Sequence, residues 1–144
     1  MRRLTRMVIV TAVALGAATL LGACASDGTD SEATRAADLA RKTVEAGEVT
    51  VKITPERIDS DGAAFAVVLD THSVELDLDI AGNARFVVDG TTWTDATWDG
   101  AGPGGHHREG TLHFTAAGGV TGPAELTING LPETVRATWN LEGG

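Results

Sequence analysis

The sequence predicts an all-β protein with one antiparallel β-sandwich domain of about seven to nine strands. Short segments in which apolar and polar residues alternate follow one another from residue 48 to the C-terminus, and such alternation is typical of half-buried strands. Gly, Asn, Asp or Pro separates these segments, as tight turns require. No segment of this region has the apolar spacing of an amphipathic helix. A small β-barrel built from the same strands is the alternative.

Residues 1–23 have the features of an export signal. Arg2, Arg3 and Arg6 form a basic start, and an apolar, uncharged stretch runs from Val8 to Ala23. This stretch is shorter than the roughly 20 residues that a membrane-spanning helix needs. It therefore favours a signal peptide that is removed from the mature protein.

The signal ends in Leu21-Gly22-Ala23-Cys24, a segment that resembles the lipobox of bacterial lipoproteins. In that motif a signal peptidase cuts before a cysteine that already carries a diacylglycerol, so the resemblance implies lipidation of Cys24. Cys24 is the only cysteine of the chain, which rules out a disulfide within it. Two or more acyl chains such as palmitate hold a protein on a membrane, at about 0.8 kcal/mol for each buried methylene. We therefore expect a protein anchored by lipid to the cell membrane, on its extracytoplasmic face.

Residues 24–47 are predicted to be a polar tether, helical in part, that lifts a domain of residues 48–144 off the membrane. Leu39 and Val44 are its only large apolar side chains, so a helix here has no apolar face to bury. Removal of the signal peptide takes away three arginines and leaves 8 basic against 20 acidic residues, a formal charge of −12. This charge argues against binding to nucleic acid and is compatible with cations or basic partners.

The first two predicted strands precede the first histidine. Residues 48–54 alternate apolar and polar side chains, and Pro55 is expected to end this strand. Residues 61–69 begin with an Asp-Gly turn signal and are apolar on both faces. A strand of this kind lies in the centre of a sheet.

Residues 73–80 alternate more strictly than any other segment and are predicted to form the third strand. Glu75, Asp77 and Asp79 lie on its polar face, about 6.6 to 7 Å apart. Calcium needs several oxygens at roughly 2.3 to 2.6 Å, and a straight strand spreads these carboxylates too far. We interpret them as a solvent-exposed face that also discourages pairing between sheet edges.

Five further strands complete the predicted domain, for which an immunoglobulin-like topology is favoured. They cover residues 84–90, 91–98, 109–116, 124–130 and 134–141. Trp93, Trp98 and Trp139 lie in these strands and are expected to be large core residues. Trp98 is also a candidate ligand contact, because it leads into the glycine-rich segment 102–110.

The four histidines are candidates for a metal site, because neutral imidazole binds zinc and copper and nearby carboxylates complete such sites. His106 and His107 lie in the glycine-rich segment, and His72 lies in a turn after residue 69. His113 is excluded, because a strand would place it about 20 Å from His107. It is expected to face solvent.

The remaining histidines converge only if the turn at residues 70–73 and the loop at 102–108 lie at the same end of the fold. Asp70 and His72 would then lie near His106, His107 or both. Three interpretations stay open: a site for copper, zinc or another small ligand, a polar network that stabilises the loops, or a solvent-exposed loop. The polar network is favoured, because imidazoles in turns commonly bind backbone groups.

These segments also resemble landmarks of small exported or lipid-anchored bacterial and archaeal proteins with an immunoglobulin-like domain. The similarity rests on "LDTHSVELDLDI", "GPGGHHREGTLHF" and "LPETVRATWNL", and it extends over residues 49–141. It implies that the two histidine segments belong to one site, and it implies no established activity. The residues that it selects are Asp70, Thr71, His72, Ser73, Gly104, Gly105, His106, His107, Arg108, Gly110, Leu112 and Phe114.

The sequence argues against an enzyme. Gly-x-Ser-x-Gly is absent, and Asp70, His72 and Ser73 lie too close along an extended chain to form a catalytic triad. The segment "GAGPGG" matches neither common phosphate-binding pattern. We therefore predict a non-enzymatic binding or interaction module of the cell envelope.

Two hypotheses describe this module. In the first, one polar site binds a small ligand or a transition metal, with copper or zinc held by His72, His106 and His107. The members of that site are Asp70, His72, Ser73, His106, His107 and Arg108. In the second, the same residues only support the fold, and a protein partner binds a sheet face.

Overall fold

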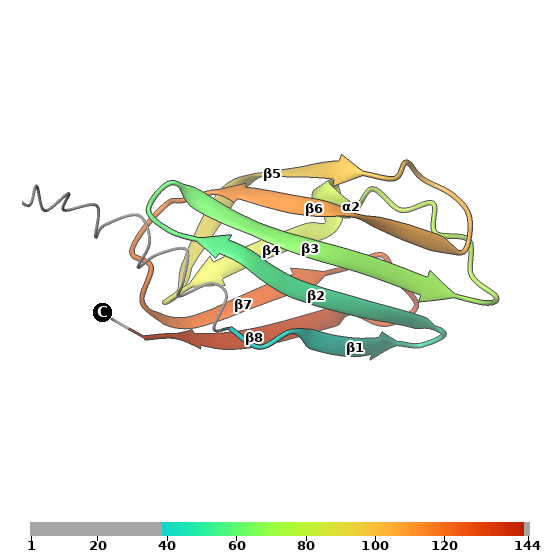
Figure 1. Cartoon of the computed structure of the whole chain (residues 1–144), viewed down its shortest axis with the longest axis horizontal. Coiled ribbons are helices and arrows are strands. Elements are labelled where there is room, and N and C mark those ends of the chain that lie inside the picture. Colours follow the sequence, from blue (N-terminus) through green and yellow to red (C-terminus); the bar gives the residue numbers. More distant parts are fainter. Residues whose placement is uncertain (1–38, 143–144) are drawn as a thin grey trace, which may run out of the picture.

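The computed structural model describes residues 39–142, which form eight strands and one short helix (Figure 1). The expected signal peptide, Cys24 and the first part of the expected tether lie outside the described residues. The strands are β1 (Lys42–Ala46), β2 (Val49–Ile58), β3 (Gly62–Thr71), β4 (Ala84–Val88), β5 (Thr91–Gly100), β6 (His107–Thr115), β7 (Gly122–Ile128) and β8 (Val135–Leu141), and the helix is α2 (Ile80–Asn83). Within residues 39–142, no helix has the length and apolar character that crossing a membrane requires.

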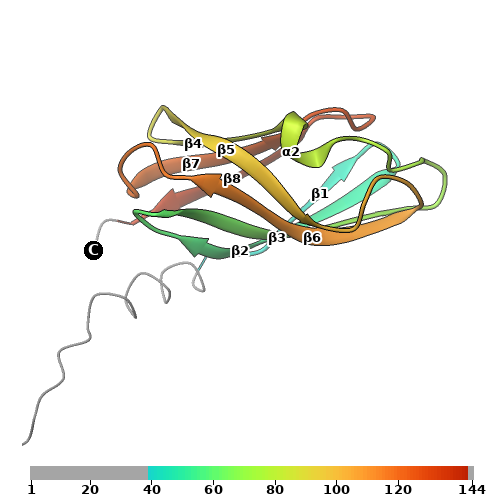
Figure 2. The same cartoon turned by 90° about the horizontal axis from the view of Figure 1, so that it is seen from above.

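The strands form one antiparallel, nearly closed sheet in the order β1-β2-β3-β6-β5-β4-β7-β8. β5 joins its two halves, because its first part pairs with β4 and its second part with β6. A register shift between Thr94 and Thr97 separates the two parts, and Asp95 within it has a φ of 53°. Figure 2 shows β5 running from the side of β4 to the side of β6. The all-β prediction is confirmed, and this barrel-like arrangement fits the alternative rather than two separate sheets.

β1 brings the two ends of the sheet together and corrects the predicted domain boundary. Residues 42–46 were expected to belong to the tether, yet they pair with β2 from Lys42 opposite Ile53 to Ala46 opposite Val49. The indole N–H of Trp139 on β8 donates to the carbonyl of Ala40 just before β1, at 2.8 Å. The fold therefore begins before residue 48, because the alternation of this segment buries Ala46 and half-buries Val44.

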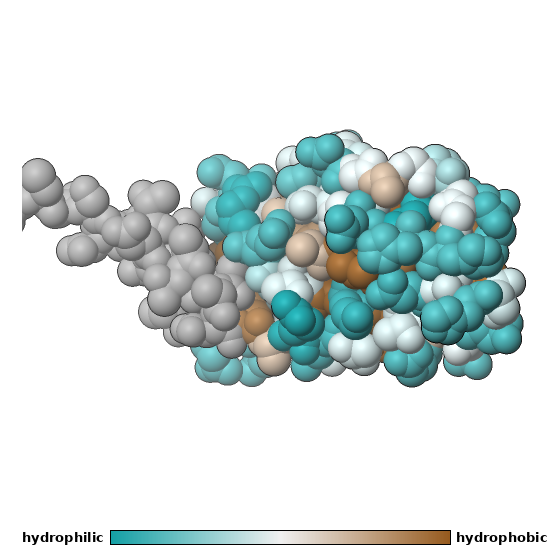
Figure 3. Space-filling view, turned by 45° about the vertical axis from the view of Figure 1, so that its right-hand side comes forward, coloured by the Kyte–Doolittle hydropathy of each residue, from teal (hydrophilic) through white to brown (hydrophobic). Residues whose placement is uncertain are grey.

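The core lies between the two halves of the sheet and is rich in aromatic rings. Phe65 of β3 contacts Phe86 edge-on, with 5.0 Å between centroids, and stacks on Trp139 at 5.5 Å. Trp93 packs edge-on against Phe86 at 5.3 Å. The prediction that Trp93 and Trp139 are core residues is confirmed, since they are 2% and 7% exposed. The outer face seen in Figure 3 is largely hydrophilic, with a hydrophobic area near its middle.

Pro55 was expected to end the predicted strand of residues 48–54, and this prediction is wrong. β2 continues through Pro55 to Ile58, with a register shift between Pro55 and Arg57. The ladder with β1 reaches only to Ile53 of β2. Proline is tolerated here because β2 has no second neighbour at this point, so the missing N–H costs no ladder bond on that side.

Residues 73–80 do not form the predicted strand. Residues 72–79 are irregular and lead into α2, where the side chain of Asp79 accepts from the N–H of Gly82 at 3.1 Å. The predicted alternation of burial survives, since Leu76 and Ile80 are buried while Glu75, Asp77 and Asp79 are exposed. Two carbonyls of this segment bind an arginine side chain instead of a neighbouring strand, which explains why the alternation produced no ladder.

Candidate functional site

The turn after β3 and the loop before β6 lie against each other. The N–H of Thr71 donates to the carbonyl of His106 at 2.9 Å. The N–H of Leu76 donates to the carbonyl of Gly105 at 2.9 Å, and the N–H of Gly104 donates back to Leu76 at 2.8 Å. The two histidine segments therefore lie at the same end of the fold, which was the condition for a shared site.

Asp70 and His107 form the closest side-chain contact of this region. They are direct partners in the ladder between β3 and β6, and His107 Nδ1 lies 2.5 Å from Asp70 Oδ1. Glu109 Oε2 lies 3.7 Å from His107 Nε2, and Lys52 Nζ lies 3.5 Å from Asp70 Oδ2. These side chains form a row of alternating charge on the outer face of three neighbouring strands.

The contact shifts the pKa of both partners. The hydrogen bond to Asp70 is the main cause that raises the pKa of His107 above its ordinary value, and the charges of Asp70 and Glu109 add to it. The same bond is the main cause that lowers the pKa of Asp70, with help from the charge of Lys52. His107 remains 56% exposed, so water screens this ion pair and its contribution to stability is small.

The other candidate polar residues do not join this contact. His72, Ser73 and His106 are exposed. The backbone N–H of Ser73 donates to Thr71 Oγ1 at 3.3 Å, and His106 contributes its carbonyl to the bond with Thr71. Among residues 39–142, the structure gives the imidazole of His72 no hydrogen-bond partner.

The structure does not assemble the expected metal ligands. In the described part of the chain, no group of three or more His, Cys, Asp or Glu side chains is arranged to hold a metal ion. The ladder places Asp70 opposite His107, whereas His72 lies beyond the end of β3. Strand register therefore gives His107 a carboxylate partner and leaves His72 outside the contact.

In the sequence His113 lies between Leu112 and Phe114, whose side chains are buried, and its own side chain is half-buried. It was expected to face solvent. The ladders place it opposite Ala64 of β3 on one side and Thr97 of β5 on the other. Because β6 has a neighbour on each side, even its outward-facing side chains lose part of their solvent exposure.

Arg108 is the buried charge of this region, with only 2% of its surface exposed. Its Nη1 donates to the carbonyls of Leu76 and Leu78 at 3.1 and 2.7 Å. Its Nε and Nη2 both donate to the carbonyl of Ala101, at 3.2 and 3.1 Å. Arg108 thus ties β6 to the irregular segment after β3 and to the loop after β5.

Trp98 covers one side of this guanidinium. The ring centroid of Trp98 lies 5.8 Å from Cζ of Arg108, and its indole N–H donates to the same carbonyl of Ala101 at 2.9 Å. Burial lowers the pKa of Arg108, and the charge of Asp79 partly offsets this effect. Arginine nevertheless stays protonated in proteins, so a full positive charge lies under the Trp98 ring.

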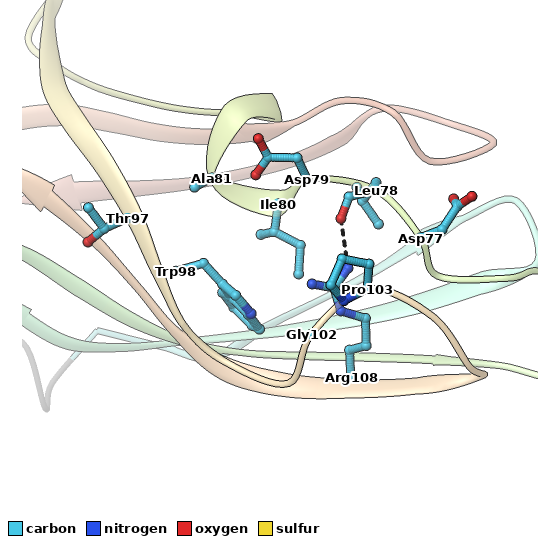
Figure 4. Close-up of a pocket in the computed structure, with 10 residues that line it drawn as sticks. All are labelled: Asp77, Leu78, Asp79, Ile80, Ala81, Thr97, Trp98, Gly102, Pro103 and Arg108. Atoms are coloured by element: carbon cyan, nitrogen blue, oxygen red, sulfur yellow. Dashed lines mark hydrogen bonds between the residues drawn. The ribbon is translucent and has the colours of Figure 1, made fainter.

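An open pocket of about 500 Å³ lies above Trp98 and Arg108. Its lining comes from the segment before and within α2, from β5, from the following loop and from β6 (Figure 4). The lining residues are Asp77, Leu78, Asp79, Ile80, Ala81, Thr97, Trp98, Gly102, Pro103 and Arg108. Figure 4 shows the guanidinium between Trp98 and Pro103 and facing Leu78, while the carboxylates of Asp77 and Asp79 point away from it.

A pair of glycines makes room for the Trp98 ring. Gly100 of β5 and Gly110 of β6 are direct ladder partners. A Cβ on Gly110 would lie 2.6 Å from Gly100 Cα and 2.7 Å from Cζ2 of Trp98. A Cβ on Gly100 would meet the same ring at 2.9 Å. The edge of the indole therefore lies close to two positions of the sheet that carry no side chain.

Sequence reasoning placed Arg108 in a polar site but missed the pocket that it lines. The alternation of side chains along β6 could have predicted this position. Arg108 is separated from the buried Leu112 and Phe114 by even numbers of residues, so all three point to the same face. No comparable signal marked Asp77 or Pro103, because their roles depend on an irregular backbone. Comparison of the chain with family models, with curated proteins and with solved structures finds no match.

Proposed function

We propose that this protein is a lipid-anchored lipoprotein on the extracytoplasmic face of the cell membrane, and that its β domain is a non-enzymatic binding module. The ligand site in this proposal is the pocket above Trp98 and Arg108. The observation that supports it best is the composition of that pocket, in which apolar walls converge on a buried guanidinium. Pockets of this size with a few converging polar groups are the usual form of small-molecule sites.

The lining favours recognition over catalysis. It offers Trp98 for stacking and Arg108 for hydrogen bonding. Nucleophilic catalysis needs a nucleophile within hydrogen-bond reach of a base, and the structure gives no hydrogen bond between two side chains of this lining among residues 39–142. The contact between Asp70 and His107 lies on the outer face of β3 and β6, and neither residue lines the pocket.

Lipid anchoring is supported by the segment Leu21-Gly22-Ala23-Cys24 after a basic and apolar N-terminus. Mass spectrometry of the membrane fraction tests it. We expect a mature N-terminus at Cys24 with covalently bound acyl chains. A mature protein that starts elsewhere and carries no lipid would refute this part of the proposal.

Ligand binding is tested by a fragment screen read by NMR of the tryptophan indoles. The chain has three tryptophans, so protein labelled with ¹⁵N at its indoles gives three assignable signals. Trp98 lines the pocket, whereas Trp93 and Trp139 are buried in the core and serve as internal references. We expect fragments that bind the pocket to shift the Trp98 signal and to leave the other two in place.

A matched pair of variants places the binding in the pocket. Gly102 lines the pocket and Gly119 does not, and a Cβ on either glycine would meet nothing within 4 Å. We expect Gly102→Phe to abolish fragment binding and Gly119→Phe to leave it unchanged. Fragment binding that survives Gly102→Phe would refute the assignment of the site.

A further inference from the structure

The charge of Arg108 has no carboxylate partner in the part of the chain that the structure describes. None of the ion pairs within 4.0 Å among residues 39–142 includes it. Its bonds go to three backbone carbonyls, which satisfy hydrogen bonds but supply only partial negative charge. Fully buried arginines are almost always paired with an anion. Arg108, at 2% exposure, departs from this rule.

The guanidinium also retains a free donor. It has five N–H groups, and the structure gives four hydrogen bonds: one from Nε, two from Nη1 and one from Nη2. One N–H of Nη2 is therefore without a protein acceptor among the described residues. We take this N–H as the donor for a ligand, because Arg108 lines the pocket.

The rest of the pocket is suited to an apolar group. Leu78, Ile80, Trp98 and Pro103 are the large apolar residues of its lining. The lining also has two carboxylates, those of Asp77 and Asp79, and both point away from the guanidinium in Figure 4. The carboxylate of Asp79 accepts from the N–H of Gly82. Arg108 is therefore the one positive charge of the lining, and neither carboxylate forms an ion pair with it.

We infer that the ligand is a small carboxylic acid with an apolar body, held by a charge-assisted hydrogen bond from Arg108 while the body packs on Trp98. This inference rests on the proposed function. A carboxylate supplies the missing anion, and one of its oxygens can accept from the free N–H of Nη2 in a charge-assisted hydrogen bond. The mature chain has a formal charge of −12, and this field disfavours ligands that carry several negative charges. A single carboxylate on an apolar body keeps that repulsion small.

Matched pairs of acids and amides test the inference. Phenylacetate is compared with phenylacetamide, and 3-phenylpropionate with its amide, by titration of full-length protein labelled with ¹⁵N at its indoles in detergent micelles. Partitioning into micelles alone is measured as a reference. We expect each acid to bind at least about tenfold more tightly than its amide, with a shift of the Trp98 signal. The indole N–H of Trp98 and the guanidinium of Arg108 donate to the same carbonyl, that of Ala101. A ligand that binds the guanidinium is therefore expected to change the indole signal of Trp98.

Variants distinguish charge from general affinity for the pocket. Arg108→Lys keeps a positive charge but loses the fork, and we expect it to weaken the acids more than the amides. Because this variant also removes structural bonds, a second test leaves Arg108 intact. Gly102→Phe is expected to abolish binding of acids and amides alike, and Gly119→Phe to change neither.

Each outcome bears on a different claim. Acids and amides of equal affinity, both lost in Gly102→Phe, would overturn the carboxylate inference and leave the binding module in place. Tighter binding of phenethylamine than of phenylacetate would do the same, because it would assign the pocket to cations. A Trp98 signal that none of these compounds moves would overturn both claims.

Discussion

Trp98 and Arg108, which come from neighbouring strands, donate hydrogen bonds to one and the same carbonyl oxygen, that of Ala101. The ring of Trp98 also covers the guanidinium, at 5.8 Å from its Cζ. This arrangement couples β5, β6 and the loop between them into one unit. The same unit forms one wall of the candidate ligand site, so its stability and ligand binding are linked.

Replacement of Arg108 is expected to destabilise the fold. Arg108→Met keeps the length of the side chain but removes the donor to the carbonyl of Leu78, one donor to that of Leu76 and two donors to that of Ala101. We expect a loss of about 2–4 kcal/mol in the free energy of unfolding, measured by urea denaturation. Arg136→Met is the control, because Arg136 is exposed and, within the described residues, forms an ion pair with Glu125 alone. Its effect should stay within about 0.5 kcal/mol. Equal losses in the two variants would contradict a special role for Arg108.

The glycine pair beneath Trp98 is expected to tolerate no side chain. In Gly110→Ala the new Cβ would approach Gly100 Cα and the Trp98 ring to less than 3 Å. We expect a loss of about 1–3 kcal/mol from overpacking and a change in Trp98 fluorescence, since the ring must move. Gly119→Ala is the control, because its Cβ would meet nothing within 4 Å. An unchanged melting temperature in Gly110→Ala would show that the ring has room to shift.

The contact between Asp70 and His107 predicts a defined pH dependence. The folded pKa of His107 is raised, so its contribution is fully present below about pH 6.5, the unfolded value, and is lost as the pH rises through the folded pKa. The folded pKa of Asp70 is lowered, so its contribution is present above about pH 3.9, the unfolded value, and is lost as the pH falls through the folded pKa. The pair therefore stabilises the fold most between about pH 4 and 6.5.

NMR titration of the His107 imidazole measures this effect directly. We expect a pKa above the ordinary value in the native chain and a fall toward about 6.5 in Asp70→Asn. Glu109→Gln should lower it less, because the bond to Asp70 is the larger cause. A larger fall in Glu109→Gln than in Asp70→Asn would reverse this assignment.

The bond from Trp139 to Ala40 is expected to hold β1 in place. Trp139→Phe removes a hydrogen bond worth about 0.5–1.5 kcal/mol, in addition to some packing. Hydrogen exchange should become faster for the amides of β1, Lys42–Ala46. Trp93→Phe is a matched control, because the buried indole N–H of Trp93 has no hydrogen-bond partner among residues 39–142. Its effect on β1 exchange should be smaller, and equal effects would show that the bond to Ala40 is not what fixes this strand.

Alternation along the chain was sufficient to predict most of the fold. Seven of the eight strands in residues 39–142 overlap the predicted ones. Strands such as β7 and β8 bury every second side chain against the core. The same alternation explains why the side chain of Arg108 points inward. It fails for residues 73–80, since alternation fixes which side chains are buried and does not fix where the backbone bonds go. β1 was missed because its only large apolar side chain in the alternating set is Val44.

The sequence by itself determined an all-β chain and the buried faces of most of its strands, because these depend on residues that are near one another in the chain; lipidation of Cys24 stays a prediction of the same local kind. Only the tertiary structure decided that β5 joins both halves of the sheet and that Asp70 pairs with His107. It also decided that Arg108 binds the carbonyls of Leu76 and Leu78 beside a pocket. These are contacts between distant segments, and strand order and register, which no local pattern encodes, bring them together.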